Sequence, residues 1–177
     1  MLTAVRIILA AAFVYLFEIE AFTFAGAAFI ISAVTDFFDG LIARKYNAVS
    51  DFGKFADPLA DKILVFSALI LFVKYGITPA WIVIFILFRE FTITGLRMVI
   101  SAKGKVIPAM LSGKIKTTVQ MIAIIFILFL VIDSAGDTAM MIGWKGISLT
   151  IANWMLFGVT LYSFIDYLAR LDLKNNL

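Results

Sequence analysis

The stretch DFFDGLIARKYNAVSDFGKFADPLAD, residues 36–61, joins two long apolar segments and carries two pairs of aspartates. Asp36 and Asp39 are three residues apart, and Asp57 and Asp61 are four apart. In a helix, these spacings place the members of each pair on one face. Because the segments on either side of the short loop would run antiparallel, we expect both pairs to lie at the same end of two neighbouring helices.

The rest of the chain is dominated by apolar residues. Of its 177 residues, 63% are hydrophobic and 15% are charged, and the mean hydropathy is +1.07. A soluble domain is about half apolar and about a quarter charged, whereas a spanning helix takes about 20 apolar residues. Six apolar segments are present, at residues 2–17, 22–43, 59–73, 79–100, 115–132 and 147–168. We therefore expect an all-α membrane protein, a single domain over residues 1–177 with six transmembrane helices.

The first segment is shorter than the others. We expect its helix to continue past Glu18 and Glu20 at the membrane interface. A cleaved signal peptide is the rival interpretation. A single Arg6 makes a thin basic region for a signal peptide, and further apolar segments follow. Both observations favour a spanning helix.

Basic residues are distributed unevenly among the predicted loops. One set of loops and the C-terminal tail hold Arg44, Lys45, Lys54, Lys103, Lys105, Lys114, Lys116, Arg170 and Lys174. The opposite loops hold only Lys74 and Lys145, and Trp81 and Trp144 lie on that side. Positive residues favour the cytoplasmic side, and Trp favours membrane interfaces. We predict a multi-pass protein of the cytoplasmic membrane with both termini in the cytoplasm.

The chain has no cysteine and no histidine. Disulfides, thiolate or histidine metal sites and a Ser-His-Asp triad are therefore excluded. Carboxylates that converge without a cation repel each other, and oxygen ligands suit Mg²⁺, Mn²⁺ or Ca²⁺. The aspartates of residues 36–61 could hold two such ions, which typically polarise phosphoryl oxygens during in-line displacement.

Two other interpretations of the aspartates remain open. Asp36 and Asp39 could form buried salt bridges with Arg44 or Lys62, while Asp57 merely caps a helix. The acids could also form a cation path in a divalent-cation transporter. Transporter sites lie near the membrane midplane and tend to accompany repeated halves, and we find no internal repeat. The sequence favours an enzyme.

The same residues carry a specific resemblance to a known family. The pattern Asp36-x2-Asp39-Gly40-x2-Ala43-Arg44-x8-Gly53-x3-Asp57-x3-Asp61 fits the signature of the CDP-alcohol phosphotransferases without a mismatch. Members of that family displace CMP from a CDP-linked lipid or alcohol with the hydroxyl of a second substrate. The resemblance implies six spans, a cytoplasm-facing polar cavity with the active site, and a homodimer.

The resemblance implies a metal site with an adjacent base. Asp36, Asp39 and Asp57 would be the principal ligands of two divalent ions, Mg²⁺ or Mn²⁺. Asp61 would be the general base and could also touch a metal. A base suits this reaction because the pKa of an alcohol is far above 7, so its attack on phosphorus requires proton removal.

The resemblance also implies a nucleotide site. Asp36, Gly40, Ala43 and Gly53 would line the cytidine site of the CDP group. Arg44 would hold the diphosphate. The chemistry agrees, because the small residues leave that helix surface open and the planar guanidinium suits phosphate oxygens.

Further stretches resemble one branch of that family, the bacterial phosphatidylglycerophosphate synthases. They are Leu2-Thr3-x2-Arg6, Asp57-Pro58-Leu59-Ala60-Asp61-Lys62, Arg89-Glu90-Phe91, Gly95-Leu96-Arg97 and Gly113-Lys114-Ile115-Lys116-Thr117-Thr118-x-Gln120-Met121. This branch implies CDP-diacylglycerol as donor, glycerol 3-phosphate as acceptor, a bacterial membrane and no nucleic-acid partner. A family member with another acceptor, such as inositol phosphate or serine, is the alternative.

A dianionic acceptor such as glycerol 3-phosphate needs several cationic donors. Arg89 and Arg97 lie in the fourth apolar segment, and Lys114 and Lys116 lie near the start of the fifth. We predict that Arg97, Lys114 and Lys116 bind the acceptor phosphate, with Arg89 and Thr117 in a supporting shell. A plain ion pair between Arg89 and Glu90 is an equally weighted alternative for that pair.

One acid lies within the last apolar segment. Asp166 could pair with Arg170 one turn later or with a basic residue of another helix. We prefer the first account, because residues four apart are neighbours on a helix surface.

Overall fold

The computed structural model describes residues 2–46, 51–102, 111–134 and 143–175. Side chains are described for these residues except 2–4, 6, 36–61, 102 and 171–175. The described residues are mainly helical and contain no strand, as the sequence predicts. The helices are α1 (Leu2–Glu18), α2 (Phe22–Tyr46), α3 (Asp51–Lys74), α4 (Ala80–Ala102), α5 (Leu111–Asp133) and α6 (Trp144–Asn175).

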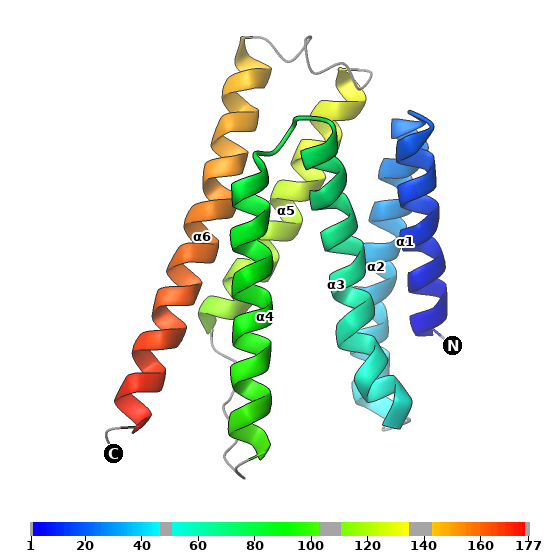
Figure 1. The fold of residues 1–177 in the computed structure, drawn as a ribbon. Coiled ribbons are helices and arrows are strands. Elements are labelled where there is room, and N and C mark those ends of the chain that lie inside the picture. Colours follow the sequence, from blue (N-terminus) through cyan, green and yellow to red (C-terminus); the bar gives the residue numbers. More distant parts are fainter. Residues whose placement is uncertain (1, 47–50, 103–110, 135–142, 176–177) are drawn as a thin grey trace.

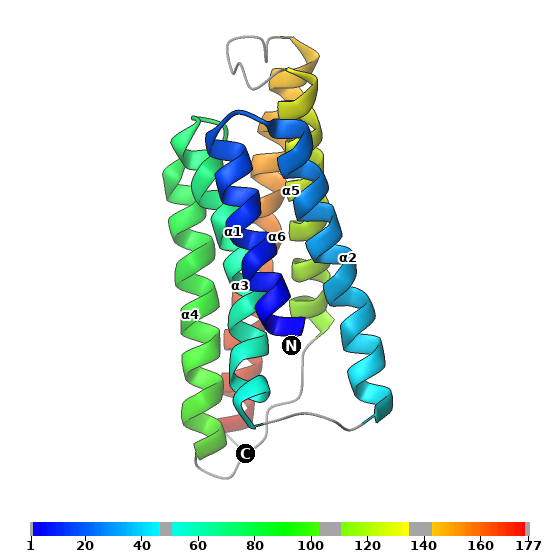
Figure 2. The same cartoon turned by 90° about the vertical axis from the view of Figure 1, so that its right-hand side faces the viewer.

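Successive helices run in opposite directions along one bundle axis (Figure 1). The N-terminus and the C-terminal end of α6 lie at the same end of the bundle in both views (Figures 1 and 2). We call this end the termini end. Helix α1 packs against α2 and α3, α5 packs against α2 and α6, and α4 packs against α3 and α6. Helix α2 therefore ends, and α3 begins, at the termini end.

Helix α1 does not continue past Glu20, so that prediction is wrong. The amide of Glu20 donates to the Phe17 carbonyl at 3.1 Å, and the amide of Ala21 donates to the Leu16 carbonyl at 2.9 Å. This pair of bonds, with φ of 59° at Glu20, is the Schellman arrangement that ends helices. Ending α1 there leaves Glu18 paired with Lys74 of α3. The hydrogen bond to Glu18 raises the pKa of Lys74 above its usual value.

Aromatic side chains hold α1, α2 and α3 together. The Phe17 ring lies 5.1 Å from Phe22, 6.3 Å from Phe72 and 5.2 Å from Tyr75, measured between centroids. Phe13 lies 5.4 Å from Phe29 in an edge-to-face contact. Such aromatic contacts add to the stabilisation from dispersion and burial, and they fix the end of the bundle that lies opposite the termini end.

The outer surface of the bundle is apolar. Large hydrophobic side chains on each of the six helices face outward, among them Phe24 (70% exposed), Phe91 (66%), Leu111 (71%) and Ile147 (63%). Soluble monomers rarely expose so many. Within the described residues, Leu111–Asp133 and Trp144–Arg170 are long and apolar enough to cross a membrane, and Ile7–Glu18 and Phe22–Thr35 are shorter apolar helical stretches. This surface suits a lipid environment.

Asn153 ties α6 to the turn between α3 and α4. Its amide Nδ2 donates to the Ile77 carbonyl at 3.0 Å, and the Thr78 hydroxyl donates to its Oδ1 at 2.9 Å. We expect Asn153→Leu to lower the free energy of unfolding by about 1–2 kcal/mol, because it leaves a buried carbonyl and a buried hydroxyl without their hydrogen-bond partner. Thermal unfolding in detergent measures the change, with the exposed Thr150→Ala as control. Equal midpoints for the two variants would refute this role.

Candidate functional site

The four aspartates of the predicted metal site fall on two antiparallel helices that are in contact. Asp36 and Asp39 belong to α2, and Asp57 and Asp61 belong to α3. Figure 2 shows the end of α2 and the start of α3 at the termini end. The backbone therefore gives the predicted topology of neighbouring antiparallel helices.

The side chains of the aspartate and nucleotide sites lie outside the described residues. This applies to Asp36, Asp39, Gly40, Ala43, Arg44, Gly53, Asp57 and Asp61. Their predicted roles thus remain predictions. One alternative is excluded by the backbone, because α3 begins at Asp51 and Asp57 therefore lies inside the helix rather than at its N-cap.

A group of charged side chains from three helices meets in the described part of the bundle. One oxygen of the Glu90 carboxylate accepts hydrogen bonds from Arg89 Nη1 at 2.6 Å and from Lys116 Nζ at 2.7 Å. Lys62 Nζ lies 3.6 Å from the other oxygen. We call Lys62, Arg89, Glu90 and Lys116 the Glu90 cluster. Its side chains come from α3, α4 and α5.

The Glu90 cluster is mostly shielded from solvent. Arg89 is 7% exposed and Lys116 is 2% exposed. The Glu90 and Lys62 side chains are 15% and 28% exposed. Burying a charge is costly unless it is paired. Among the side chains that the structure describes, one carboxylate contacts three cations, which leaves a net charge of +2 for the Glu90 cluster. A site of this charge favours an anion.

Neutral polar groups extend the Glu90 cluster. Lys62 Nζ donates to the Thr94 hydroxyl at 2.7 Å, and Arg89 Nη2 donates to the Ser163 hydroxyl of α6 at 2.6 Å. Two buried donors, Arg89 Nε and Gln120 Nε2, have no acceptor among the described residues. Gln120 follows Lys116 by one helical turn, so both lie on one face of α5. An unpaired buried donor is costly, and an acceptor oxygen placed near either one would remove that cost.

The four residues predicted to bind the acceptor phosphate differ in burial. Arg89 and Lys116 are buried and meet at Glu90. Arg97 and Lys114 are exposed on α4 and α5. The predicted alternative of an ion pair between Arg89 and Glu90 is confirmed as a contact, but Glu90 also binds Lys116.

Sequence reasoning missed several members of this polar region, namely Lys62, Thr94, Gln120 and Ser163. The spacing of Lys116 and Gln120 was a usable signal, because polar residues four apart in an apolar helix mark one inward face. Lys62 was named as a possible partner of Asp36 or Asp39 and as part of one family-like stretch, but neither observation predicted its contact with Glu90. The predicted pair of Asp166 and Arg170 is confirmed, with Arg170 Nε donating to the carboxylate at 2.8 Å.

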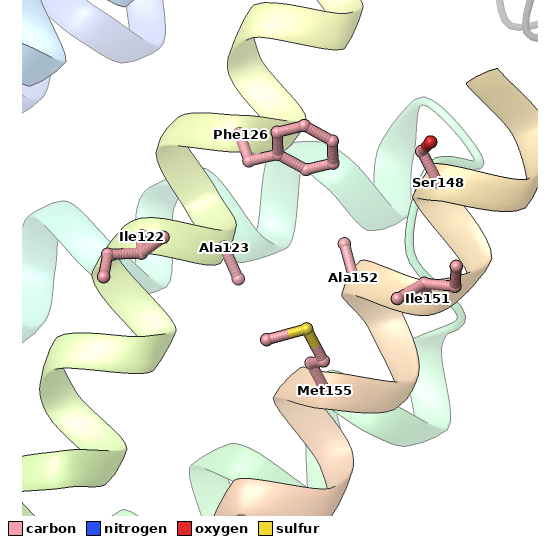
Figure 3. A pocket seen from close by; sticks show the side chains of 7 residues that line it. All are labelled: Ile122, Ala123, Phe126, Ser148, Ile151, Ala152 and Met155. Carbon is pink, nitrogen blue, oxygen red and sulfur yellow. The ribbon is translucent and has the colours of Figure 1, made fainter. Parts of the chain in front are cut away.

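An apolar pocket of about 320 Å³ lies between α5 and α6 (Figure 3). It is lined by Ile122, Ala123, Phe126, Ser148, Ile151, Ala152 and Met155. Its lining includes no charged side chain, so it offers nothing to hold a phosphate. The Glu90 cluster is the better candidate for polar chemistry.

Comparison with known proteins places the chain in a family. Residues 1–164 match the CDP-alcohol phosphatidyltransferase family. The chain belongs to this family of integral membrane enzymes, which confirms the resemblance of residues 36–61.

Bacterial relatives support a narrower assignment within the family. A CDP-diacylglycerol–glycerol-3-phosphate 3-phosphatidyltransferase of Bacillus subtilis is 55% identical over 96 residues, 54% of this chain and 50% of the relative. A probable phosphatidylglycerophosphate synthase of Mycobacterium tuberculosis is 48% identical over 100 residues, which cover 56% of this chain and 47% of the relative. A CDP-diacylglycerol–glycerol-3-phosphate 3-phosphatidyltransferase of Rickettsia bellii is 39% identical over 137 residues, which cover 77% of this chain and 74% of the relative. The chain spans about half the length of the first two relatives.

Proposed function

We propose that the protein transfers the phosphatidyl group of CDP-diacylglycerol to glycerol 3-phosphate, giving phosphatidylglycerophosphate and CMP. Family membership and the names of the relatives support the reaction. The observation that carries the choice of acceptor is the Glu90 cluster, with its net charge of +2 and adjacent buried donors. A phosphate monoester matches that charge, whereas serine does not.

In this proposal the acceptor phosphate binds at the Glu90 cluster. Lys116 and Arg89 are buried cations, and charge-assisted hydrogen bonds to phosphate are strong. Arg89 Nε and Gln120 Nε2, which have no acceptor in the described part of the chain, offer further donors. Arg97 and Lys114 are exposed, and we assign them to attracting and guiding the anion rather than to its final binding.

The aspartates form the reaction centre of the proposed enzyme. Asp36, Asp39 and Asp57 would hold two divalent ions, Mg²⁺ or Mn²⁺, for which carboxylates are suitable ligands. When bound, these ions neutralise charge on phosphoryl oxygens. Asp61 accepts the proton of the acceptor hydroxyl as that oxygen bonds to phosphorus and the bond to CMP breaks. General-base removal of this proton makes the alcohol nucleophilic.

The nucleotide part of the donor lies against α2 and the first half of α3 in this proposal. Gly40, Ala43 and Gly53 leave room for the cytidine beside Asp36, and Arg44 holds the diphosphate. The support is the complete match of these positions to the family signature.

We place the protein in a bacterial cytoplasmic membrane, with all six helices spanning and the termini end in the cytoplasm. The apolar outer surface and the basic residues near the termini end support this orientation. Substrates and CMP would then exchange with the cytoplasm through a polar cavity at that end. Homodimerisation stays a prediction.

Purified full-length protein tests the proposal directly. CMP release is measured with CDP-diacylglycerol, Mg²⁺ or Mn²⁺, and separately glycerol 3-phosphate, inositol phosphate or serine. Release that depends on glycerol 3-phosphate supports the proposal. Release with another acceptor reassigns the substrate within the family, and metal uptake into vesicles without CMP release would favour a transporter.

Replacing Lys116 with glutamine is expected to raise the KM for glycerol 3-phosphate by roughly 10- to 150-fold, because one charge-assisted hydrogen bond is lost. The KM for CDP-diacylglycerol should stay nearly unchanged. Lys145→Gln is the matched control, since Lys145 pairs with Asp133 at the other end of α5. A parallel rise in both KM values would instead indicate a role at the donor diphosphate.

A further inference from the structure

Glu90 differs from the other acids with described ion pairs. Glu18 pairs with Lys74, Asp133 with Lys145 and Asp166 with Arg170, each a single described cation. Glu90 contacts Lys62, Arg89 and Lys116. An acid whose only purpose is to neutralise a buried cation needs one partner, so the excess of cations calls for a different explanation.

We propose that Glu90 is a positioning residue that holds the cations of the acceptor site in a phosphate-binding arrangement. The inference rests on the proposed function and deepens it. Arg89 Nη1 and Lys116 Nζ donate to the same carboxylate oxygen, at 2.6 Å and 2.7 Å. Their charged groups come from α4 and α5, and like charges this close repel each other. The shared carboxylate offsets that repulsion and keeps both cations at one place.

The charge of the Glu90 cluster fits this role. Among the described side chains, the three cations and one carboxylate give a net charge of +2, which equals the charge of a phosphate monoester dianion in magnitude. A second nearby carboxylate would reduce the attraction for that anion. Removing Glu90 would increase the charge but release the cations from their common acceptor. Because Lys116 is 2% exposed, its ammonium could not simply turn into solvent.

Glu90 also connects the acceptor site to the helix that carries the proposed base. Lys62 directly follows Asp61 in α3. Its ammonium donates to Thr94 of α4 at 2.7 Å and lies 3.6 Å from Glu90. The contacts of Lys62 therefore join α3 to the part of α4 that carries Arg89. Through them, Glu90 fixes the acceptor cations relative to the reaction centre.

The test compares Glu90→Gln and Glu90→Asp with Asp133→Asn, which neutralises the acid of the Lys145 pair. We expect Glu90→Gln to raise the KM for glycerol 3-phosphate by roughly tenfold or more, with little change in the KM for CDP-diacylglycerol. Glu90→Asp keeps the charge on a shorter side chain and should show a smaller rise. Asp133→Asn should leave both KM values unchanged.

A second readout does not depend on turnover. Inorganic phosphate should raise the thermal unfolding midpoint of the wild type and of Asp133→Asn, because a ligand that binds the folded state stabilises it. The midpoint of Glu90→Gln should respond much less. If the wild type releases no CMP in response to glycerol 3-phosphate, only the proposed function is refuted. The stabilisation by phosphate would still test the positioning role of Glu90.

Several results would overturn the inference. An unchanged KM for glycerol 3-phosphate in Glu90→Gln would show that the carboxylate does not position the cations. A lowered KM would show that Glu90 merely occupies the place of the phosphate. If Glu90→Gln does not fold, the Glu90→Asp variant is the test. If that variant has the same KM for glycerol 3-phosphate and the same stabilisation by phosphate as the wild type, the positioning role is refuted.

Discussion

Replacing Asp57 with alanine is expected to lower the turnover of CMP release by about a thousandfold or more at saturating substrates, because electrostatic stabilisation of the developing phosphoryl charge is a large catalytic term. Asp57 is proposed as a metal ligand on α3, so its loss removes a carboxylate that the divalent ions need. Binding of Mn²⁺, measured by titration calorimetry on the detergent-solubilised protein, should fall in parallel.

Asp51→Ala is the matched control for this variant. Asp51 lies on the same helix as Asp57, at a position that the signature of residues 36–61 leaves unspecified. The control should retain both metal binding and turnover. Substantial CMP release by Asp57→Ala at saturating Mg²⁺ or Mn²⁺ would rule out the proposed metal site.

Asp61→Asn is expected to reduce kcat by roughly 100-fold or more, the usual scale for loss of a general base. The asparagine is nearly the same size but cannot accept the proton of the acceptor hydroxyl. The KM for CDP-diacylglycerol should change little, because the donor is held mainly by other residues. Steady-state kinetics of CMP release measures both constants.

The opposite pattern would assign Asp61 a different role. A variant that binds CDP-diacylglycerol poorly but reaches normal turnover at high substrate would make Asp61 mainly a ligand. Comparison with Lys116→Gln separates the two substrate sites. The lysine variant should lose affinity for the acceptor and keep turnover near saturation, whereas the Asp61 variant should lose turnover.

The sequence predicted which helices carry the aspartates, but it did not predict which cations meet in the described part of the bundle. The aspartate signature is local, with its members within 26 residues, so helix spacing and one short loop suffice to place both pairs at one end of two neighbouring helices. The acceptor cations are scattered over α3, α4 and α5. The sequence grouped Lys116 with Lys114 and Arg97, but the structure buries Lys116 beside Arg89.

The amino-acid sequence by itself determined the all-helical class, the approximate segments and the placement of the acidic pairs at one end. Continuous apolar runs and the spacing of charged residues carry this information locally. Tertiary structure decided that α1 ends at Glu18 and that three cations converge on Glu90. In a bundle whose outer and inner surfaces are both apolar, hydropathy does not fix the rotation of a helix about its axis. Packing between α3, α4, α5 and α6 fixes it, and thereby selects which polar side chains are buried together.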